Sequence, residues 1–376
     1  MAGATTLKLR GLWLSVHKWI GLLLAVLIIP VSVTGSALVW HDGLDDLLNP
    51  QRVVEGRADK APGDYAAAVQ GQLQDGERIA SARWPEDGEG AVQVVATRPP
   101  AEGQRRAPRT TFWVHPESME VLDTARGGGG AVQFLHVLHG SLQIPNLGRQ
   151  IVGWVGVFML ISCLTGIWLW WPVTGSVARG FRWRRQPSFN ANLHHQLGFW
   201  VLIPLAMLSA TGVWISFPQT FSGFEASAEK APAPKQAGPP RPAQPLERTA
   251  LTIDQVLAEV GQAGSGRLAT VTWPTDQKAE WQLTFDGGVE AAVEDRPGGE
   301  LRVGAPEERP ETIARVMRRW HDGQGMGFVW QLLIFIGGII PAILAVTGIL
   351  MWWRSRKWRG GAKKRAKPAP VPAAAE

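Results

Sequence analysis

The sequence predicts an α-helical membrane protein with four transmembrane helices, arranged as two span–outer domain–span repeats with two small α+β domains outside the membrane. Three observations lead to this fold class. The 376-residue chain contains four long apolar blocks, its basic residues gather in the segments on one side of those blocks, and the pattern of block and connector occurs twice.

The four apolar blocks are the predicted membrane spans. None of them contains Asp, Glu, Lys or Arg, and each is as long as a helix needs to be to cross a bilayer. We expect transmembrane helices at residues 19–40, 151–171, 197–217 and 326–353. The first block is longer than the apolar core of a cleaved signal peptide, so we expect an uncleaved anchor.

The segments that join the spans alternate in charge. Three of them together contain 15 basic residues and one acidic residue: 1–18, 172–196 and 354–376. Because basic loops are retained in the cytoplasm, both termini are predicted to be cytoplasmic, and residues 41–130 and 218–312 form the outer domains. The net charge of +6 then reflects membrane topology. We therefore expect the lipid bilayer as a partner, and we do not expect the chain to bind nucleic acid.

The two outer domains share a sequence pattern. The stretch ARWPEDGEGAVQVVA at 82–96 resembles VTWPTDQKAEWQLTF at 271–285. In each domain a short helix-like segment precedes this stretch, and a predicted hairpin follows it, at 114–121 and at 293–301. Three further segments are predicted: an interfacial helix at 131–150, an interfacial segment at 313–325, and a Pro/Ala-rich linker at 225–248.

Composition excludes several kinds of chemistry. The single cysteine, Cys163, lies inside the second span, which excludes intramolecular disulfides, thiolate-bound iron–sulfur clusters and covalent c-type haem. The sequence has neither a Walker motif nor an H-E-x-x-H zinc motif. We expect no flavin or nicotinamide domain after the fourth span, so a redox role is expected to need electrons from a partner protein or from quinol.

His17 and His194, called the first pair below, occupy matching positions in the repeat. Each precedes a Thr-Gly dipeptide of its own span, and the interval from His17 to Thr34 equals that from His194 to Thr211. Under the predicted topology this pair lies near the cytoplasmic surface. Two imidazoles from neighbouring helices are the axial ligands of a six-coordinate b-type haem. Thr34 or Thr211 is expected to bond to neighbouring backbone or to haem propionates.

His139 and His321, the second pair, match in the same way. Each precedes the Thr-Gly dipeptide of an even-numbered span, and the interval from His139 to Thr165 equals that from His321 to Thr347. This pair is expected near the outer surface, because it lies ahead of the even-numbered spans. Two b haems, one per pair, would connect the two sides of the membrane.

Other interpretations of the histidines stay open at this point. A histidine at a membrane interface also anchors a helix among lipid headgroups, and a duplication retains residues for structural reasons. His136, three residues before His139, is an alternative ligand, and His195 and His41 are further alternates. Four small residues are expected to make room for a porphyrin: Gly21, Gly35, Gly198 and Gly212.

Four stretches of the chain resemble the PepSY-associated transmembrane helix family. They are HKWIGLLLAVLIIPVSVTGSALVWHDGLDDLLNP, LHGSL…GRQIVGW…TGIWLWWP, LHHQLGFW…TGVWISFPQ and WHDGQGMGF…TGILMWWR. The resemblance covers all four spans and, more loosely, both outer domains. It implies PepSY-like periplasmic domains and a place in the bacterial inner membrane.

That family includes inner-membrane ferric-siderophore reductases with two b haems, so the resemblance implies a redox function. It implies that His17 and His194 ligate one haem b and that His139 and His321 ligate the other. The expected activity transfers electrons from quinol or a cytoplasmic reductase to a periplasmic ferric-siderophore. Iron(II) binds the hard oxygen ligands of siderophores more weakly than iron(III), so reduction releases iron for uptake.

The alternative hypothesis is a non-redox membrane protein. Its PepSY-like outer domains would bind a peptide, a protease or a siderophore complex, and its spans would anchor or transport. This hypothesis explains the outer domains but leaves the paired histidines without a role.

Overall fold

The computed structural model describes eight stretches of the chain: residues 4–100, 107–127, 130–171, 176–183, 186–225, 242–261, 266–304 and 312–365. The chain divides into two compact units. The helix unit consists of Met1–His41, Leu135–Lys230 and Glu311–Glu376. The sheet unit consists of Asp42–Phe134 and Ala231–Pro310. Most of the linker predicted at 225–248 and the end of the tail predicted at 354–376 fall outside the described residues.

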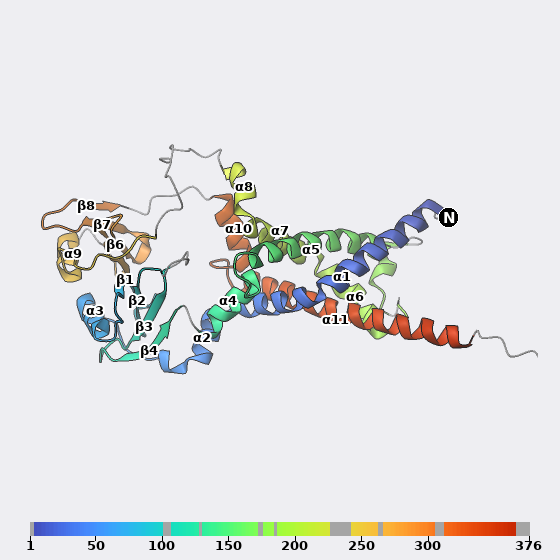
Figure 1. Cartoon of the computed structure of the whole chain (residues 1–376), viewed down its shortest axis with the longest axis horizontal. Helices are drawn as coiled ribbons and strands as arrows, with labels where there is room; N and C mark the ends of the chain where they lie inside the picture. Colours follow the sequence, from blue (N-terminus) through green and yellow to red (C-terminus); the bar gives the residue numbers. More distant parts are fainter. Residues whose placement is uncertain are drawn as a thin grey trace, which may run out of the picture. The chain divides into compact units, whose positions relative to one another are not determined.

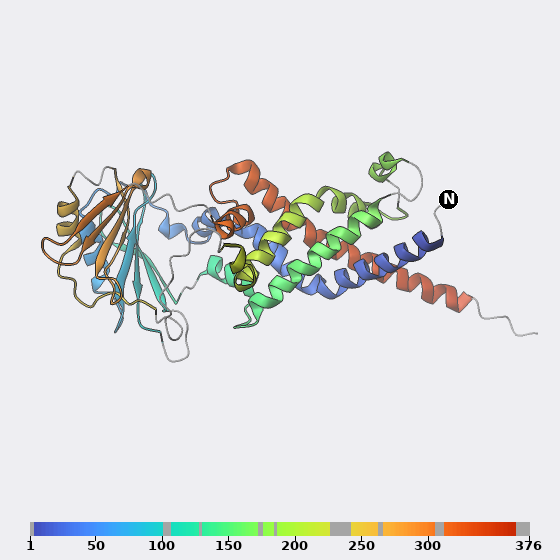
Figure 2. The ribbon, with the colours of Figure 1, turned by 90° about the horizontal axis from the view of Figure 1, so that it is seen from above.

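The helix unit is a bundle of long apolar helices. Its elements are α1 (Ala4–Leu38), α4 (Ala131–Ser141), α5 (Gly148–Trp170), η2 (Val177–Phe181), α6 (Phe189–Trp200), α7 (Leu202–Ser216), α8 (Pro218–Glu225), α10 (Ile313–Asp322) and α11 (Phe328–Arg365). Among the described helices, α1, α5 and α11 are long and apolar enough to cross a membrane, and α6 with α7 makes a fourth candidate if this bent pair is one span. The four lie side by side (Figures 1 and 2).

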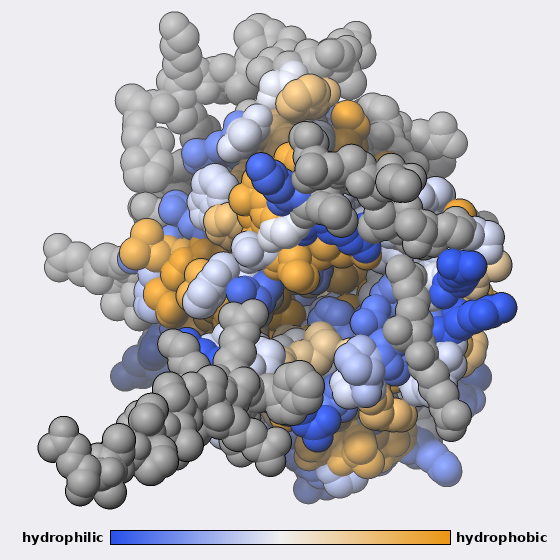
Figure 3. Space-filling model, turned by 90° about the vertical axis from the view of Figure 1, so that its right-hand side faces the viewer, coloured by the Kyte–Doolittle hydropathy of each residue, from blue (hydrophilic) through white to orange (hydrophobic). Residues whose placement is uncertain are grey.

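Large apolar side chains lie on the outside of this bundle. Leu23 and Val26 of α1, Ile203 of α7 and Val329 of α11 are between 71 and 80% exposed. Figure 3 shows hydrophobic residues on the surface beside hydrophilic ones. An apolar surface of this kind marks contact with a partner or a membrane, so the exposed positions suit lipid.

Glycines allow α5 and α7 to pack closely. A β-carbon at Gly153 would lie 2.5 Å from the ring of Phe217, and one at Gly156 would lie 2.8 Å from the side chain of Val213. Small residues let the backbones of membrane helices approach, which replaces the hydrophobic driving force that is absent in lipid.

The third predicted span, at 197–217, is not one continuous helix. α6 ends at Trp200, α7 begins at Leu202, and the two meet at a bend of 64°. Pro204 lies four residues after Trp200, where its ring clashes with the Trp200 carbonyl of a straight helix and its missing N–H removes a hydrogen bond. The prediction is therefore corrected to a bent pair.

The sheet unit is built on one eight-stranded antiparallel sheet, with the strand order β4-β3-β2-β1-β5-β6-β7-β8. The strands are β1 (Arg78–Arg83), β2 (Val92–Thr97), β3 (Arg109–Val114), β4 (Val121–Arg126), β5 (Leu268–Thr272), β6 (Glu280–Phe285), β7 (Glu290–Glu294) and β8 (Leu301–Gly304). Its helices are α2 (His41–Leu48), η1 (Pro50–Arg52), α3 (Pro62–Gln70), α9 (Ile253–Val260) and η4 (Asp286–Gly288). The hairpins predicted at 114–121 and 293–301 are confirmed as β3–β4 and β7–β8.

The two predicted outer domains are joined in this one sheet. β1 and β5 pair antiparallel at its centre, with Ala82 opposite Val271, its own counterpart in the repeated stretches. The backbone amides of Trp84 and Trp273, also counterparts, each donate to the opposite chain segment at 2.9 Å. A local two-fold axis therefore passes between β1 and β5. Separate domains would each leave this strand edge unpaired, so the prediction of two domains is corrected to two halves of a sheet.

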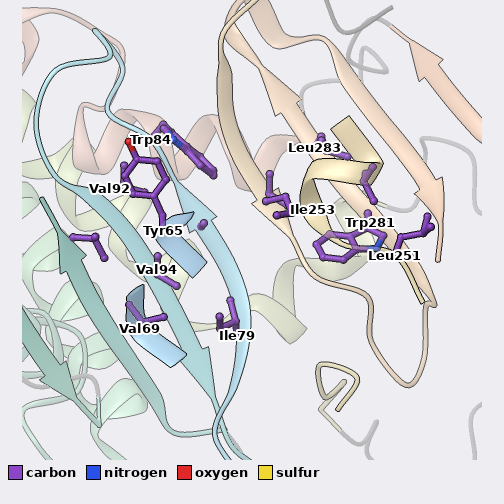
Figure 4. Packing of buried hydrophobic residues seen from close by; sticks show 14 of the residues in the cluster. Tyr65, Val69, Ile79, Trp84, Val92, Val94, Leu251, Ile253, Trp281 and Leu283 are labelled. Carbon is purple, nitrogen blue, oxygen red and sulfur yellow. The ribbon is translucent and has the colours of Figure 1, made fainter. Parts of the chain in front are cut away.

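α3 and α9 cover the same face of the sheet (Figure 1). Tyr65 and Val69 of α3 pack on the strands of the first half, and Ile253 of α9 packs near Trp281 in the second half (Figure 4). The buried Tyr65 hydroxyl donates to the carbonyl of Pro116 at 2.9 Å, which satisfies its polar end. One hydrophobic core thus serves both halves.

Arg52 fixes η1 to the outer edge of the sheet. Its side chain is 9% exposed and donates to Asp45 at 2.8 Å and to Asp123 of β4 at 2.6 Å. The guanidinium also lies 3.7 Å from the centroid of the Trp113 ring. Partial burial raises the pKa of Asp123, but hydrogen bonds from Arg52 and the backbone of Thr124 lower it by more, so the net pKa lies below its ordinary value.

Replacing this residue, Arg52→Ala, should loosen the β3–β4 edge by roughly 2 kcal/mol, because two carboxylates lose their donor and an aromatic ring loses its cation. Hydrogen–deuterium exchange of peptides from 109–126 measures this local stability. Arg57→Ala is the matched control, since Arg57 is 60% exposed and pairs with Asp59 at the surface, where an effect below about 0.5 kcal/mol is expected. Equal exchange in the two variants would contradict the anchoring role of Arg52.

Candidate functional site

The four matched histidines come together as two pairs. His17 of α1 and His194 of α6 have ring centroids 6.3 Å apart and ring planes at 88°. His139 of α4 and His321 of α10 have centroids 5.9 Å apart and planes at 43°. Two imidazoles that bind one metal ion from opposite sides, with metal–nitrogen distances of about 2 Å, have centroids about 6 Å apart. Both separations suit that arrangement.

The two pairs lie at different levels of the bundle. His139 contacts the backbone of Val31, which lies on α1 well beyond His17. The helix between those two positions makes roughly four turns, which corresponds to roughly 21 Å along its axis. Each pair takes one histidine from each sequence repeat, so the pairing follows the pseudo-symmetry of the chain.

In the first pair, both imidazoles are held by threonines of an adjacent helix. Nδ1 of His17 lies 2.9 Å from Oγ1 of Thr165 on α5. Nδ1 of His194 lies 2.9 Å from Oγ1 of Thr347 on α11. In both cases the threonine comes from the same repeat as the histidine, because the end of an even-numbered span lies level with the start of the span before it.

The second pair is held in two different ways. Nδ1 of His321 lies 2.9 Å from Oγ1 of Thr211 on α7. Nδ1 of His139 instead lies 2.8 Å from the carbonyl oxygen of Val31. Thr34, at the matching position on α1, donates its hydroxyl proton to the carbonyl of Pro30 at 2.6 Å.

These hydrogen bonds indicate which imidazole nitrogen carries the proton. Each of the three threonines that meet a histidine donates its one proton to the carbonyl four residues earlier, at 2.9 Å: Thr165 to Ile161, Thr211 to Met207 and Thr347 to Ile343. Their hydroxyl oxygens therefore accept from the imidazole, as the Val31 carbonyl must. A neutral histidine held in this way has its proton on Nδ1 and a lone pair on Nε2, the form that ligates a metal.

Burial supports the neutral form in the second pair, which lies outside the apolar spans. Desolvation lowers the pKa of His139 and of His321, and the adjacent His139 ring lowers that of His321 further. The three threonines are 2 to 5% exposed, whereas the four imidazoles are half-buried. The supporting hydroxyls are thus shielded from solvent.

A glycine follows each threonine and lies against the histidine ring. A β-carbon there would approach the Cε1 atom of the imidazole: 2.6 Å for Gly35 and His139, 3.3 Å for Gly212 and His321, 3.4 Å for Gly166 and His17, and 3.7 Å for Gly348 and His194. Of these four positions, position 35 therefore tolerates a side chain least. Gly21 and Gly198 have no atom within 4 Å of a built β-carbon, so the expectation that they make room for a porphyrin stays a prediction.

His195 lies beside the first pair but belongs to a different contact. Its ring stacks on Trp170 with centroids 5.8 Å apart and planes at 17°. Its Nε2 lies 3.2 Å from the carbonyl oxygen of Gly180 in η2, so it donates there. The ring thus fastens the loop after α5 to α6.

His136 and His41 lie near the second pair without forming it. His136 is exposed on α4, and its charged neighbours are His41, Arg318 and Asp322. Nε2 of His41 lies 3.3 Å from the side-chain nitrogen of Gln324. The ring that faces His321 is that of His139, three residues further along α4.

The support from Thr165 and Thr347 was missed by the sequence analysis, which considered only Thr34 and Thr211. The signal was present, because a Thr-Gly dipeptide ends all four spans. In antiparallel neighbours, the end of one span meets the start of the previous one. Matching each histidine to the dipeptide on the adjacent helix would have found both contacts.

The donor set of each pair is two imidazoles. Within the described stretches, no group of three or more His, Cys, Asp and Glu side chains is arranged to hold a metal ion. The four nitrogens of a porphyrin bind its iron in the plane, and two axial positions then remain for protein ligands. Two imidazole nitrogens match that requirement.

Comparison with known proteins identifies the family of the chain. A family model described as the PepSY-associated TM region matches residues 14–355. The matched range includes both histidine pairs, all four Thr-Gly dipeptides and the whole sheet. No curated protein matches the chain.

Proposed function

The chain belongs to the PepSY-associated transmembrane family, and from this premise we propose that it is a di-haem b electron-transfer protein that reduces ferric-siderophore. It is a multi-pass membrane protein with candidate spans α1, α5, α6–α7 and α11. The observation that carries the redox proposal is the pairing of His17 with His194 and of His139 with His321, with ring centroids at separations that suit one iron each.

The residues at both pairs fit haem b. His17 and His194 would hold one haem, and His139 and His321 the other, through Nε2 in each case. When bound, haem b supplies one-electron chemistry between iron(III) and iron(II). The only cysteine, Cys163, is buried in α5, so the fit is to a haem held by ligation and packing without thioether bonds.

The protein orients these ligands through its helices. Thr165 and Thr347 hold the imidazoles of the first pair from α5 and α11, and Thr211 holds His321 from α7. The glycine after each threonine lets the ring lie against the helix backbone. The apolar side chains between the two levels, among them Ala25, exclude water from the interior of the bundle.

The direction of electron flow follows from the charge pattern of the sequence. Basic residues in the loop after α5 and in the tail favour a cytoplasmic location for the first pair and for both termini, and the proposed membrane is the bacterial inner membrane. Electrons would come from quinol or from a cytoplasmic reductase. The second pair then lies toward the periplasm, where Arg318, Asp322, His41 and His136 offer polar groups to a water-soluble iron(III) chelate. The released product is iron(II), which the siderophore binds weakly.

Haem counting tests the assignment of the four ligands. A pyridine haemochrome assay on the detergent-purified chain should give two b haems, and His194→Ala and His139→Ala should each give one. Their matched controls are His195→Ala and His136→Ala, which change a neighbouring histidine on the same helix and should retain two.

Two outcomes would count against this assignment. Equal haem loss in His195→Ala and His194→Ala would contradict the assignment of the first pair as haem ligands. A wild-type chain that is colourless after expression with ample haem would favour the non-redox hypothesis, in which the sheet unit binds a peptide, a protease or a siderophore complex.

The glycine contacts generate a second test. Gly35→Ala places a methyl group 2.6 Å from His139 and should weaken haem binding at the second pair about tenfold or more, because the ligand ring must move. Gly348→Ala is the matched control, since its methyl group would lie at an ordinary contact distance of 3.7 Å from His194. Haem titration of both variants measures the difference, and equal affinities would contradict the close approach of His139 to α1.

A further inference from the structure

The Thr-Gly dipeptides do not serve the two histidine pairs equally. In the first pair both imidazoles meet a threonine hydroxyl, from Thr165 and from Thr347. In the second pair only His321 does, through Thr211, while its partner donates to the backbone carbonyl of Val31. The other three imidazoles also have a backbone partner three residues before their threonine, so the threonine hydroxyl is the contact that distinguishes them from His139. Three of the four equivalent threonines are therefore bonded to a candidate ligand, and Thr34 is not.

We infer that Thr165, Thr347 and Thr211 are positioning residues that tune the redox potential of the haem held at their pair, and that Thr34 has no such role. This inference rests on the proposed haem binding. It adds to that function a set of residues that act on the iron through the imidazole, without contact to substrate.

The physical link is the electron density on Nε2. An acceptor at Nδ1–H draws the proton away from the ring and makes the imidazole a stronger donor to its metal. A stronger donor stabilises iron(III) relative to iron(II), which lowers the potential. The threonine hydroxyl is well placed for this, because its own proton is donated to the helix carbonyl and the two hydrogen bonds strengthen one another.

Thr34 differs because His139 lies closer to its helix than the other rings do. A β-carbon at Gly35 would be 2.6 Å from His139, against 3.3 to 3.7 Å at the other three dipeptides. The His139 ring meets the carbonyl of Val31, as the other rings meet the equivalent carbonyls, but the Thr34 hydroxyl bonds along its own helix. Side-chain substitution cannot remove a backbone acceptor, so Thr34→Val is an internal control with the same change in chemistry.

The experiment is a potentiometric titration of the purified full chain, followed by visible absorbance. Thr165→Val and Thr347→Val should each raise the ferrous-to-ferric ratio of the first-pair haem about tenfold at a fixed applied potential, which is about 59 mV for a one-electron couple. Thr211→Val should do the same at the second pair. Thr34→Val should leave both haems unchanged. The single haem that remains in His194→Ala or His139→Ala identifies which absorbance belongs to which pair.

Serine variants separate tuning from packing. Thr165→Ser keeps the hydroxyl and should restore the wild-type potential, and it should retain haem even if Thr165→Val loses it. The inference is overturned if both substitutions shift the potential or lose the haem alike, if Thr165→Val leaves the potential unchanged, or if Thr34→Val shifts it as far as Thr211→Val. A wild-type chain without haem overturns the proposed function together with the inference, whereas two haems with unshifted potentials overturn the inference alone.

Discussion

A threonine hydroxyl has one proton, and three threonines of this bundle have already given theirs to the carbonyl four residues earlier. What remains is an acceptor, which favours donation from Nδ1 of the histidine beside each threonine. That constraint leaves the lone pair on Nε2, and it directs Nε2 away from the supporting helix. The glycine after each threonine is the second requirement, because the edge of the imidazole ring lies where a side chain would otherwise be. The candidate ligand geometry depends on these local contacts.

The duplication of the chain organises both units. Each repeat supports its own two histidines, with His17 held from α5 and His194 held from α11, and each pair then takes one ring from each repeat. In the sheet unit the same duplication appears as a two-fold relation between β1 and β5, with Ala82 facing Val271. Neither repeat is complete alone, since one would present half of each histidine pair and an unpaired strand edge. The symmetry is broken at the second pair, where His139 meets the backbone carbonyl of Val31 and the Thr34 hydroxyl bonds along its own helix.

Much of this arrangement could be predicted from spacing. The runs without charge located the helices, and the equal intervals from histidine to threonine identified which histidines are counterparts. The bend before α7 was harder to predict, because prolines at Pro30 and Pro341 lie inside unbroken helices and only Pro204 coincides with a break. The joining of the outer halves depends on edge pairing between β1 and β5, which are far apart in the chain, and periodicity within one segment does not report such pairing. The threonine contacts were missed for a related reason, since they form between helices and not along one.

The proposal that each pair holds a haem iron between two imidazoles is tested most directly by an electron paramagnetic resonance spectrum of the oxidised, purified chain. The account predicts two low-spin ferric signals of the bis-imidazole type. The first-pair signal should be the more anisotropic, because its ring planes stand at 88° and those of the second pair at 43°, and perpendicular imidazoles bring the iron π orbitals closer in energy. A high-spin ferric signal, a single low-spin signal, or a chain without haem signal would contradict it.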